Sequence, residues 1–479
     1  MAVTKKACVQ VPFFEGAEHD WLGNSVSLRG LDIEPRHVLQ IFHRSDPSQF
    51  VWLSYGEICA LAGDFYGTYT PICYGEKHAG RAKLFLEAYD LLKHEAMTTM
   101  KSLQELLRKE ISMTSPPYPA GVQGSEKWRH EPVSHKEWEK VTMNRNMKLP
   151  SFLALATINF DHFGEDAYNV YCSIHQLAIE QAAQGRSVDN LRAAYAMNAF
   201  ADHFLQDLFS AGHLRTPRRA LHDWKHYKNR ELDRLARVAV NFWQWRVFPT
   251  LWYMSRDLLS KIMHDEESEI GLKVKGDYPT NDGKDTWTTR TWKCYGDKRL
   301  HDDIDDENKS FCQKAVQASV DEVFEAWKTQ KPLPLPTDKD ETFKFNLTIM
   351  RPVPCAQDEQ ALQPLAMVSD GRLTYRYPWF VEKSPLRLPW IILQDRLKVI
   401  VLENASRRIK SFLSKLMWWQ ELVKKRRLAT TCFMRGYDST GPSRPFIQAI
   451  VGQRNNGRVR PAAAAESKDK HNRRAANVV

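Results

Sequence analysis

The sequence predicts a mainly α protein, in which many helices form one large domain that is followed by an irregular C-terminal extension. Three observations predict this fold class. Apolar residues recur at helical spacing in several long stretches, and strand-like alternation is confined to short pieces beyond residue 270. The chain has 479 residues, of which 43% are hydrophobic, and this is enough for a large core.

The first long helical pattern covers residues 80–110. Residues 112–147 follow with prolines, glycines and charged residues, and this composition predicts a loop or insertion. Residues 149–184 begin with an apolar run and continue as a helix. Residues 271–300 are predicted to form a loop or small hairpin over the candidate metal-binding residues named below. A further helix follows, with acidic residues at its start and Phe311 and Trp327 among its apolar positions.

A helix is also predicted from Ser187, because Ser187 and Asp189 are suitable first residues and apolar side chains such as Phe200 and Phe204 recur at helical spacing. Gly212 is expected to close it. His203 and Asp207 are one turn apart, so they share a face on which they could hold one cation, and His213 follows the glycine. The alternative is a capped core helix with a satisfied histidine.

The prolines of 331–336 end the predicted 1–330 domain. Residues 331–385 predict a small mixed segment, with strand-like alternation in 342–350 and 373–381. Residues 386–452 are predicted to form a basic amphipathic helical region. Its 390–427 segment carries tryptophans and could either lie on an anionic membrane or pack against the body. Residues 453–479 predict a disordered basic tail.

Charge is concentrated at the C-terminal end. Residues 401–479 contain 17 Lys and Arg against 5 Asp and Glu, whereas residues 1–400 contain 51 against 53. A basic end favours an acidic partner such as a lipid surface or nucleic acid, or is simply a solvated segment. The N-terminus lacks the apolar run of a signal peptide, and no stretch has the length of a membrane span. A cytoplasmic location is therefore expected, and 390–427 is the one candidate segment for peripheral membrane contact. The eight cysteines form no CxxC pair, which fits reduced thiols.

The pattern His-x3-Asp-x5-His, formed by His203, Asp207 and His213, resembles the core motif of the zinc-dependent phospholipase C and single-strand nuclease superfamily. The resemblance implies that His203 and Asp207 bind metal, that Asp207 bridges two ions, and that His213 binds another. His162, in a His-Phe segment one helix upstream, matches a further zinc ligand of the phospholipases.

Other ligands follow from the same resemblance. Asp64, in a Gly-Asp-Phe-Tyr-Gly segment, matches an aspartate ligand, although an Asp capping a turn is an equally ordinary explanation. His19, in a His-x-Trp-Leu segment, matches a ligand of a third metal; 18 residues precede it here, whereas in the family the N-terminal amine also binds that metal. The alternative is a loop histidine at the surface. The expected His-x3-Glu is missing. We therefore predict His264, with Glu267 as its partner, and take His222 as second choice.

These residues predict a zinc-dependent phosphodiester hydrolase with two or three Zn²⁺ ions, in which Asp207 and Asp64 are catalytic and a metal-activated water attacks phosphorus. We expect a phospholipid substrate, as in phospholipase C, with Arg215, Arg218 and Arg219 receiving a phosphate or head group unless they only satisfy a helix end. The alternatives are a single-strand nuclease of the same fold and a non-catalytic helical scaffold. Four residues are expected to orient the imidazoles: Asp161, Glu165, Asp166 and His175.

Overall fold

The structure is a computed structural model. It describes residues 16–31, 37–43, 45–114, 133–143, 145, 149–222, 260–261, 263–279, 287–332, 350–360, 364, 366–369 and 372–375. The predicted regions 386–452 and 453–479 lie outside these residues, as does the 390–427 segment expected to contact membranes. Within the described part, no helix is both long and apolar enough to cross a bilayer.

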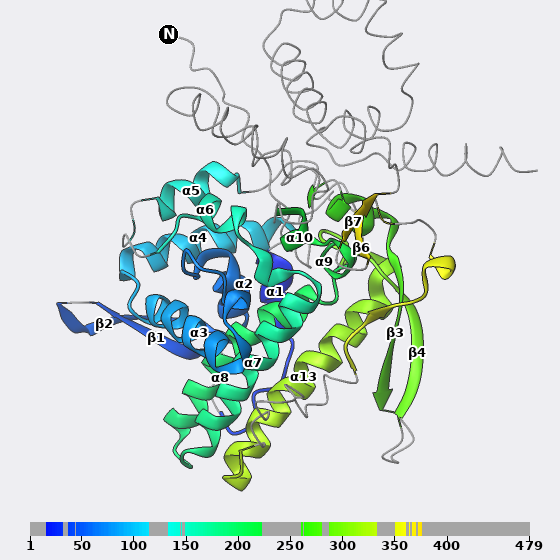
Figure 1. Ribbon diagram of the computed structural model, residues 1–479. Helices are drawn as coiled ribbons and strands as arrows, with labels where there is room; N and C mark the ends of the chain where they lie inside the picture. The colour runs from blue at the N-terminus through cyan, green and yellow to red at the C-terminus, as the bar shows by residue number, and fades with distance from the viewer. Residues whose placement is uncertain are drawn as a thin grey trace, which may run out of the picture.

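The mainly α prediction is confirmed, and helices make up most of the described chain (Figure 1). The longer ones are α1 (Gly16–Asn24), α2 (Tyr55–Phe65), α3 (Lys77–Lys93), α4 (Met97–Thr114), α5 (His135–Thr142), α7 (Gly164–Ala183), α8 (Val188–Asp207) and α13 (Asp306–Thr329). The shorter ones are α6 (Phe152–Thr157), α9 (Ala211–Arg215), α10 (Arg218–His222), and the 3-10 turns η1 (Ile72–Tyr74), η3 (Phe160–His162), η5 (Asp303–Asp305) and η6 (Gln357–Glu359).

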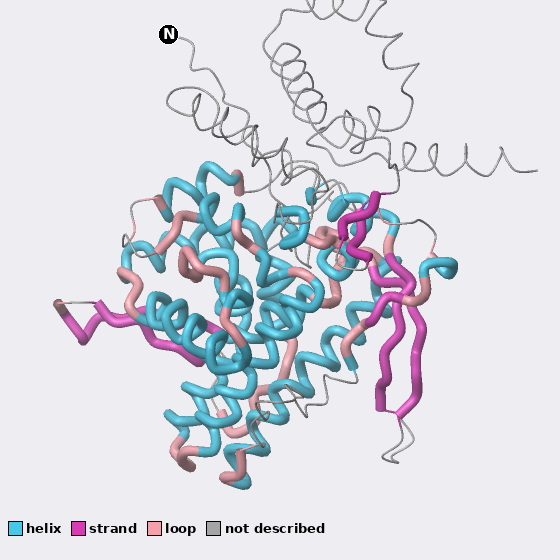
Figure 2. The backbone as a smooth tube through the Cα atoms, viewed as in Figure 1, coloured by secondary structure: helices cyan, strands magenta, loops and turns pink. Residues whose placement is uncertain are grey.

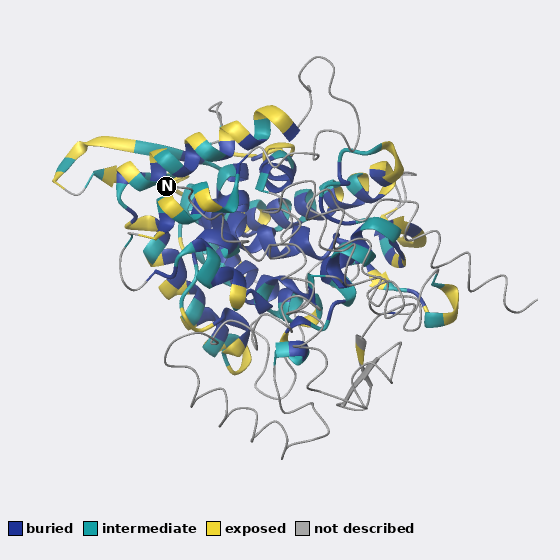
Figure 3. Cartoon of the chain, turned by 90° about the horizontal axis from the view of Figure 1, so that it is seen from above, coloured by how far each residue is buried: buried dark blue, intermediate teal, exposed yellow. Residues whose placement is uncertain are grey.

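The central helices are α7 and α8, which are joined by a short loop and pack along each other, with α13 across both. Ser187 caps α8 as predicted, because its hydroxyl accepts a hydrogen bond from the Asn190 N–H. Most positions along the second half of α8 are buried, and Figure 3 shows the buried residues gathered at the middle of the molecule. The C-terminal end of α8 therefore lies inside the protein.

The strands form small sheets at the margins (Figure 2). One hairpin, β1 (His37–His43) with β2 (Asp46–Ser54), projects from one side. On the other side β3 (Leu272–Pro279) pairs with β4 (Trp287–Cys294) and with β5 (Val353–Pro354), so the predicted hairpin within 271–300 is confirmed. A third pair is formed by β6 (Ala366–Ser369) and β7 (Arg372–Tyr375), and β7 includes the first residues of the predicted 373–381 strand. The rest of that prediction, 376–381, lies outside the described residues, as do residues 342–349 of the other predicted strand.

Two sequence predictions were wrong in detail. The 112–147 loop contains helix α5, which begins with a capping box: the Ser134 hydroxyl accepts from the Glu137 N–H, and the Glu137 carboxylate accepts from the Ser134 N–H. Gly212 does not close the Ser187 helix. That helix ends at Asp207, and Gly212 lies inside the short helix α9.

Candidate metal centre

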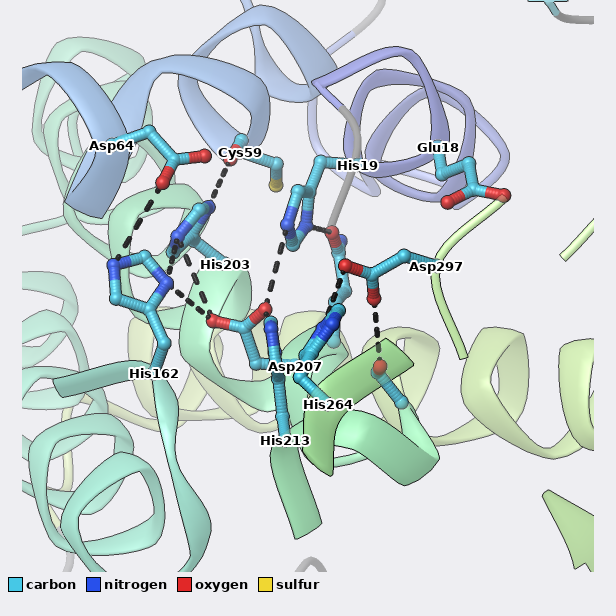
Figure 4. A network of polar contacts seen from close by, with 12 residues as sticks. Glu18, His19, Cys59, Asp64, His162, His203, Asp207, His213, His264 and Asp297 are labelled. Atoms are coloured by element: carbon cyan, nitrogen blue, oxygen red, sulfur yellow. Dashed lines mark hydrogen bonds and ion pairs between the residues drawn. The ribbon is translucent and has the colours of Figure 1, made fainter. Parts of the chain in front are cut away.

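The last turn of α8 places His203 and Asp207 on one buried face, pointing to the same region (Figure 4). The Nδ1 of His203 lies 2.7 Å from the backbone carbonyl oxygen of Cys59, on α2. Because a carbonyl can only accept, Nδ1 carries the proton and Nε2 is left as the electron-pair donor. Nε2 lies 3.7 Å from Oδ2 of Asp207, in the arrangement expected for two ligands of one cation.

Asp207 is the centre of the site. Its Oδ2 lies 2.8 Å from Nδ1 of His162, and its Oδ1 lies 2.7 Å from Nδ1 of His213. His19 approaches Oδ1 as well, with Nε2 at 3.6 Å. The two oxygens of one carboxylate thus face different sets of imidazoles, which suits a ligand shared by two cations.

One group of possible ligands consists of Asp64, His162 and His203, whose ligand atoms all lie within 4.8 Å of one another. Asp64 comes from the C-terminal end of α2, and His162 from η3. A Cβ atom on the neighbouring Gly63 would lie 2.8 Å from Nε2 of His162, closer than a real contact allows. Glycine at position 63 therefore makes room for the His162 imidazole beside Asp64.

A second group consists of His213, His264 and Asp297. Nε2 of His264 lies 2.9 Å from Oδ2 of Asp297, and the two side chains form a buried ion pair. This pair places an imidazole nitrogen and a carboxylate oxygen side by side, as two ligands of one cation would lie. His264 lies in a helical stretch that includes residues 263–270. A Cβ on Gly212 would lie 2.5 Å from Cδ2 of His264, so glycine allows this helix to approach His213.

His19, on α1, forms a third group with His203 and Asp207. Its Nδ1 lies 2.6 Å from Oε1 of Gln206, which leaves Nε2 facing Asp207, and its ring stacks on His203 with 4.3 Å between centroids. Burial lowers the pKa of His19 to about 4, so its imidazole is neutral and able to bind metal. Residues 1–15 lie outside the described part.

The electrostatics divide the histidines into two kinds. Burial alone would lower the pKa of His162 and His264, but the facing carboxylates of Asp207 and Asp297 raise both to about 9. Burial lowers the pKa of His203 well below its ordinary value, and the neighbouring His19 lowers it further. Although burial opposes it, the surrounding imidazoles hold the pKa of Asp207 well below its ordinary value. The centre thus contains ionised carboxylates and neutral imidazoles. It also contains imidazolium groups, whose positive charge balances the carboxylates as a bound metal ion would.

Sequence reasoning missed Asp297 as a ligand and proposed Glu267 as the partner of His264. The Glu267 carboxylate instead accepts from Arg215, with Nη2 to Oε2 at 2.7 Å. Asp297 comes from the loop after β4, which the sequence had placed over the site without a role. One signal was available: Gly296-Asp297 repeats the glycine-ligand order of Gly63-Asp64 and Gly212-His213.

The predicted substrate arginines all contact protein groups. Arg215 pairs with Glu267, Arg218 is buried and donates to Oδ1 of Asn159, and Arg219 pairs with Asp166. His222, the second choice for a ligand, packs its ring 4.9 Å from that of Phe160. The role of the three arginines toward substrate stays a prediction.

The residues expected to orient the imidazoles contact other groups. Asp161 accepts from the backbone N–H groups of Ile72 and Cys73, and Glu165 pairs with Arg351. His175 belongs to a separate buried network, with Nδ1 2.6 Å from Oδ1 of Asn198. The orienting contacts instead come from the Cys59 carbonyl, Gln206 and Ser210, whose hydroxyl donates to Oδ1 of Asp297 at 2.8 Å.

No match to this chain was found among protein-family models, curated proteins or solved structures. The class of this protein is therefore defined by its fold and its candidate site alone. It is a mainly α protein whose described residues include three groups of His and Asp that could hold metal ions, two of which share His203.

Proposed function

We propose that this chain is a zinc-dependent phosphodiester hydrolase, most similar in chemistry to phospholipase C, with two or three Zn²⁺ ions held around Asp207. The observation that carries the proposal is the position of Asp207, whose Oδ1 and Oδ2 each lie within 2.8 Å of a different histidine. A carboxylate in this position would bridge two ions, and adjacent ions are the usual device for in-line displacement at phosphorus.

The donor set supports zinc. All of the possible ligands are imidazole nitrogens and carboxylate oxygens, which Zn²⁺ accepts readily, and the described cysteines are not among them. Asp207 would add a fourth ligand to Asp64, His162 and His203, because its Oδ2 lies 2.8 Å from Nδ1 of His162 and 3.7 Å from Nε2 of His203. The group of His213, His264 and Asp297 supplies three ligands, as in catalytic zinc sites that keep a position open.

Ions bound here would supply Lewis-acid stabilisation of the phosphoryl oxygens and lower the pKa of a coordinated water to about 7. The chain's own residues prepare the site. Cys59 and Gln206 fix the rings of His203 and His19, so that the electron pair on each Nε2 faces the centre. Burial of the ligands excludes bulk water, which strengthens each charge interaction within the site.

The resemblance in ligand order favours a phospholipid substrate over a nucleic acid. His162, one helix, then His203, Asp207 and His213 follow one another as in the zinc phospholipases. A single-strand nuclease of the same fold would use the same metals, so the choice between the two substrates is made by experiment.

The test begins with the zinc content of the purified full-length protein, measured by plasma mass spectrometry, for the wild type and Asp207→Asn. Asn keeps the size of the side chain but removes its charge. The matched control is Asp189→Asn, whose side chain is 91% exposed. We expect at least two zinc ions in the wild type and the control, and a clear loss in Asp207→Asn without unfolding.

Activity is then measured on phosphatidylcholine vesicles, by release of the phosphorylated head group, and on single-stranded DNA. We expect vesicle hydrolysis that Asp207→Asn reduces more than about 100-fold, because the bridging ligand is lost. Cleavage of DNA without lipid hydrolysis would assign the centre to a nuclease. Wild-type protein that is offered zinc and binds none would contradict the proposal, and zinc binding without either activity would leave a metal-stabilised scaffold.

A further inference from the structure

The loop from Tyr295 to Asp302 carries Asp297 and is fixed to several elements of the candidate metal centre. The backbone carbonyl of Tyr295 accepts a hydrogen bond from the Ala211 N–H, at the start of the helix that carries His213. The N–H of Gly296 donates to the carbonyl of Ser268, on the helix that carries His264. The loop therefore joins the two elements that supply the other members of its ligand group.

Glu18 makes the connection from α1 to this loop. Its Oε2 accepts from the Lys298 N–H at 3.0 Å, and its Oε1 accepts from the Leu300 N–H at 3.1 Å. Glu18 and Leu300 are both buried. Figure 4 shows Glu18 directed away from the histidines, whereas its neighbour His19 is directed toward Asp207.

The backbone between these two hydrogen bonds is unusual. Lys298, which directly follows Asp297, has φ +69°, in the left-handed region that residues with a side chain rarely adopt. Such a conformation persists only when its surroundings enforce it. The Glu18 carboxylate is attached to the N–H of that residue and to the N–H two positions later, so it is placed to enforce the turn.

We propose that Glu18 is a positioning residue for Asp297: by accepting both N–H groups it holds the 295–302 loop in the conformation that presents the Asp297 carboxylate to His213 and His264. This inference rests on the proposed function, because it assigns Glu18 to one particular zinc ion. Neighbouring residues of α1 thus serve different ions: His19 faces the Asp207 side, and Glu18 supports the group that contains Asp297.

The experiment compares zinc content and zinc affinity, measured by competition with a chelator, for full-length wild type, Glu18→Asp, Asp297→Ala and the double variant. Asp keeps the charge but is one methylene too short to reach both N–H groups. We expect Glu18→Asp to weaken one zinc ion about tenfold or more, the effect typical of a lost outer-shell partner. We expect the double variant to lose no more zinc than Asp297→Ala, because both changes act on the same ion.

Two controls separate positioning from general destabilisation. Glu57→Gln changes another carboxylate that accepts a backbone N–H, that of Ser54, away from this loop, and should retain wild-type zinc affinity. Combining Glu18→Asp with Asp64→Ala should weaken zinc binding additively, because Asp64 belongs to the ligand group of His162 and His203 and not to that of Asp297. Circular dichroism monitors folding, and Glu18→Gln, which retains the length and one acceptor, replaces Glu18→Asp if that variant does not fold.

Glu18 variants with wild-type zinc content and affinity, beside an Asp297→Ala protein that has lost zinc, would overturn the positioning role while leaving the proposed function intact. Losses in the double variant that exceed those of Asp297→Ala would also overturn it. Wild-type protein without zinc would overturn the proposed function and this inference together.

Discussion

The hydroxyl of Ser210 donates a 2.8 Å hydrogen bond to Oδ1 of Asp297, although the two residues are far apart in the sequence. Ser210 directly precedes the helix that carries His213, so the contact fixes one predicted ligand to the element that supplies another. Oδ2 of Asp297 is left facing His264. A serine between two helices thereby helps to select which carboxylate oxygen is offered to a cation.

Replacing Ser210 by alanine should weaken zinc binding by the group that contains Asp297. The lost bond is one to a charged acceptor, worth roughly 1.5–3 kcal/mol, which corresponds to about 10-fold or more in affinity. Chelator competition measures the effect. Ser112→Ala, which removes an exposed hydroxyl that donates to the Lys109 carbonyl, is the control. Equal affinities in the two variants would show that Ser210 does not hold Asp297.

Gly63→Ala should displace His162 and disturb the first ligand group. The added Cβ would lie 2.8 Å from His162 and 2.9 Å from Phe204, and both are buried, so neither can yield without moving the core. We expect destabilisation of about 1–3 kcal/mol and loss of zinc. Gly185→Ala is the matched control, because nothing lies within 4 Å of its Cβ position. The measurements are zinc content and thermal unfolding, and a Gly63→Ala protein that keeps both at wild-type values would refute this account of the glycine.

Zinc binding should release protons, and should do so most clearly near pH 7.5. In the metal-free protein the pKa values of His162 and His264 are about 9, so both rings are charged at that pH, and each must lose a proton before it can bind zinc. Calorimetric titration in buffers of different ionisation enthalpy counts the protons. We expect affinity to increase with pH up to about 9. Heats that do not depend on the buffer would contradict this protonation of the metal-free site.

The same pKa values predict how the metal-free protein responds to pH. A histidine whose pKa is raised by folding stabilises the protein fully below about pH 6.5, and this contribution is lost as the pH rises through 9. Unfolding of the metal-free form should therefore become easier between pH 6.5 and 9. The zinc-loaded protein should not follow this trend, because its ligands are already deprotonated. Denaturant titrations of both forms across this range make the comparison.

Arg215→Gln tests whether this arginine serves the fold or the substrate. Arg215 makes three hydrogen bonds to the buried Glu267, and removal of one partner from such a pair typically costs about 3–5 kcal/mol. We expect a large loss of stability in urea unfolding. The control, Arg192→Gln, breaks the Arg192–Asp189 pair, in which Asp189 is largely exposed, and should cost less than about 1 kcal/mol. Unchanged stability with a raised KM would instead assign Arg215 to substrate binding.

The sequence predicted those parts of the site that depend on local spacing. His203 and Asp207 lie one turn apart on a helix whose start Ser187 marks, and that geometry follows from helical periodicity alone. The resemblance added His162, Asp64 and His19, and the apolar helix that ends in a carboxylate cluster added His264. The structure places all four around Asp207 or beside Asp297.

Asp297 could not be predicted in the same way. It reaches His264 only because the β3–β4 hairpin folds back and returns the chain to the helix that carries that histidine. Contact between two residues this far apart in the sequence depends on tertiary packing, and the periodicity of a single sequence does not reveal it. Helix α5 was missed for another reason: prolines and glycines earlier in 112–147 concealed its capping box.

The candidate ligands extend along the chain from His19 to Asp297, on elements that are far apart in sequence. Ions bound among them would act as reversible cross-links that close very long loops. A link of this kind disfavours the unfolded chain more as the enclosed loop grows. Removing the metal would then resemble reducing a set of disulfides: α1 would lose its link to the end of α8, and the loop after β4 its link to His213 and His264, even if every helix between them stayed intact.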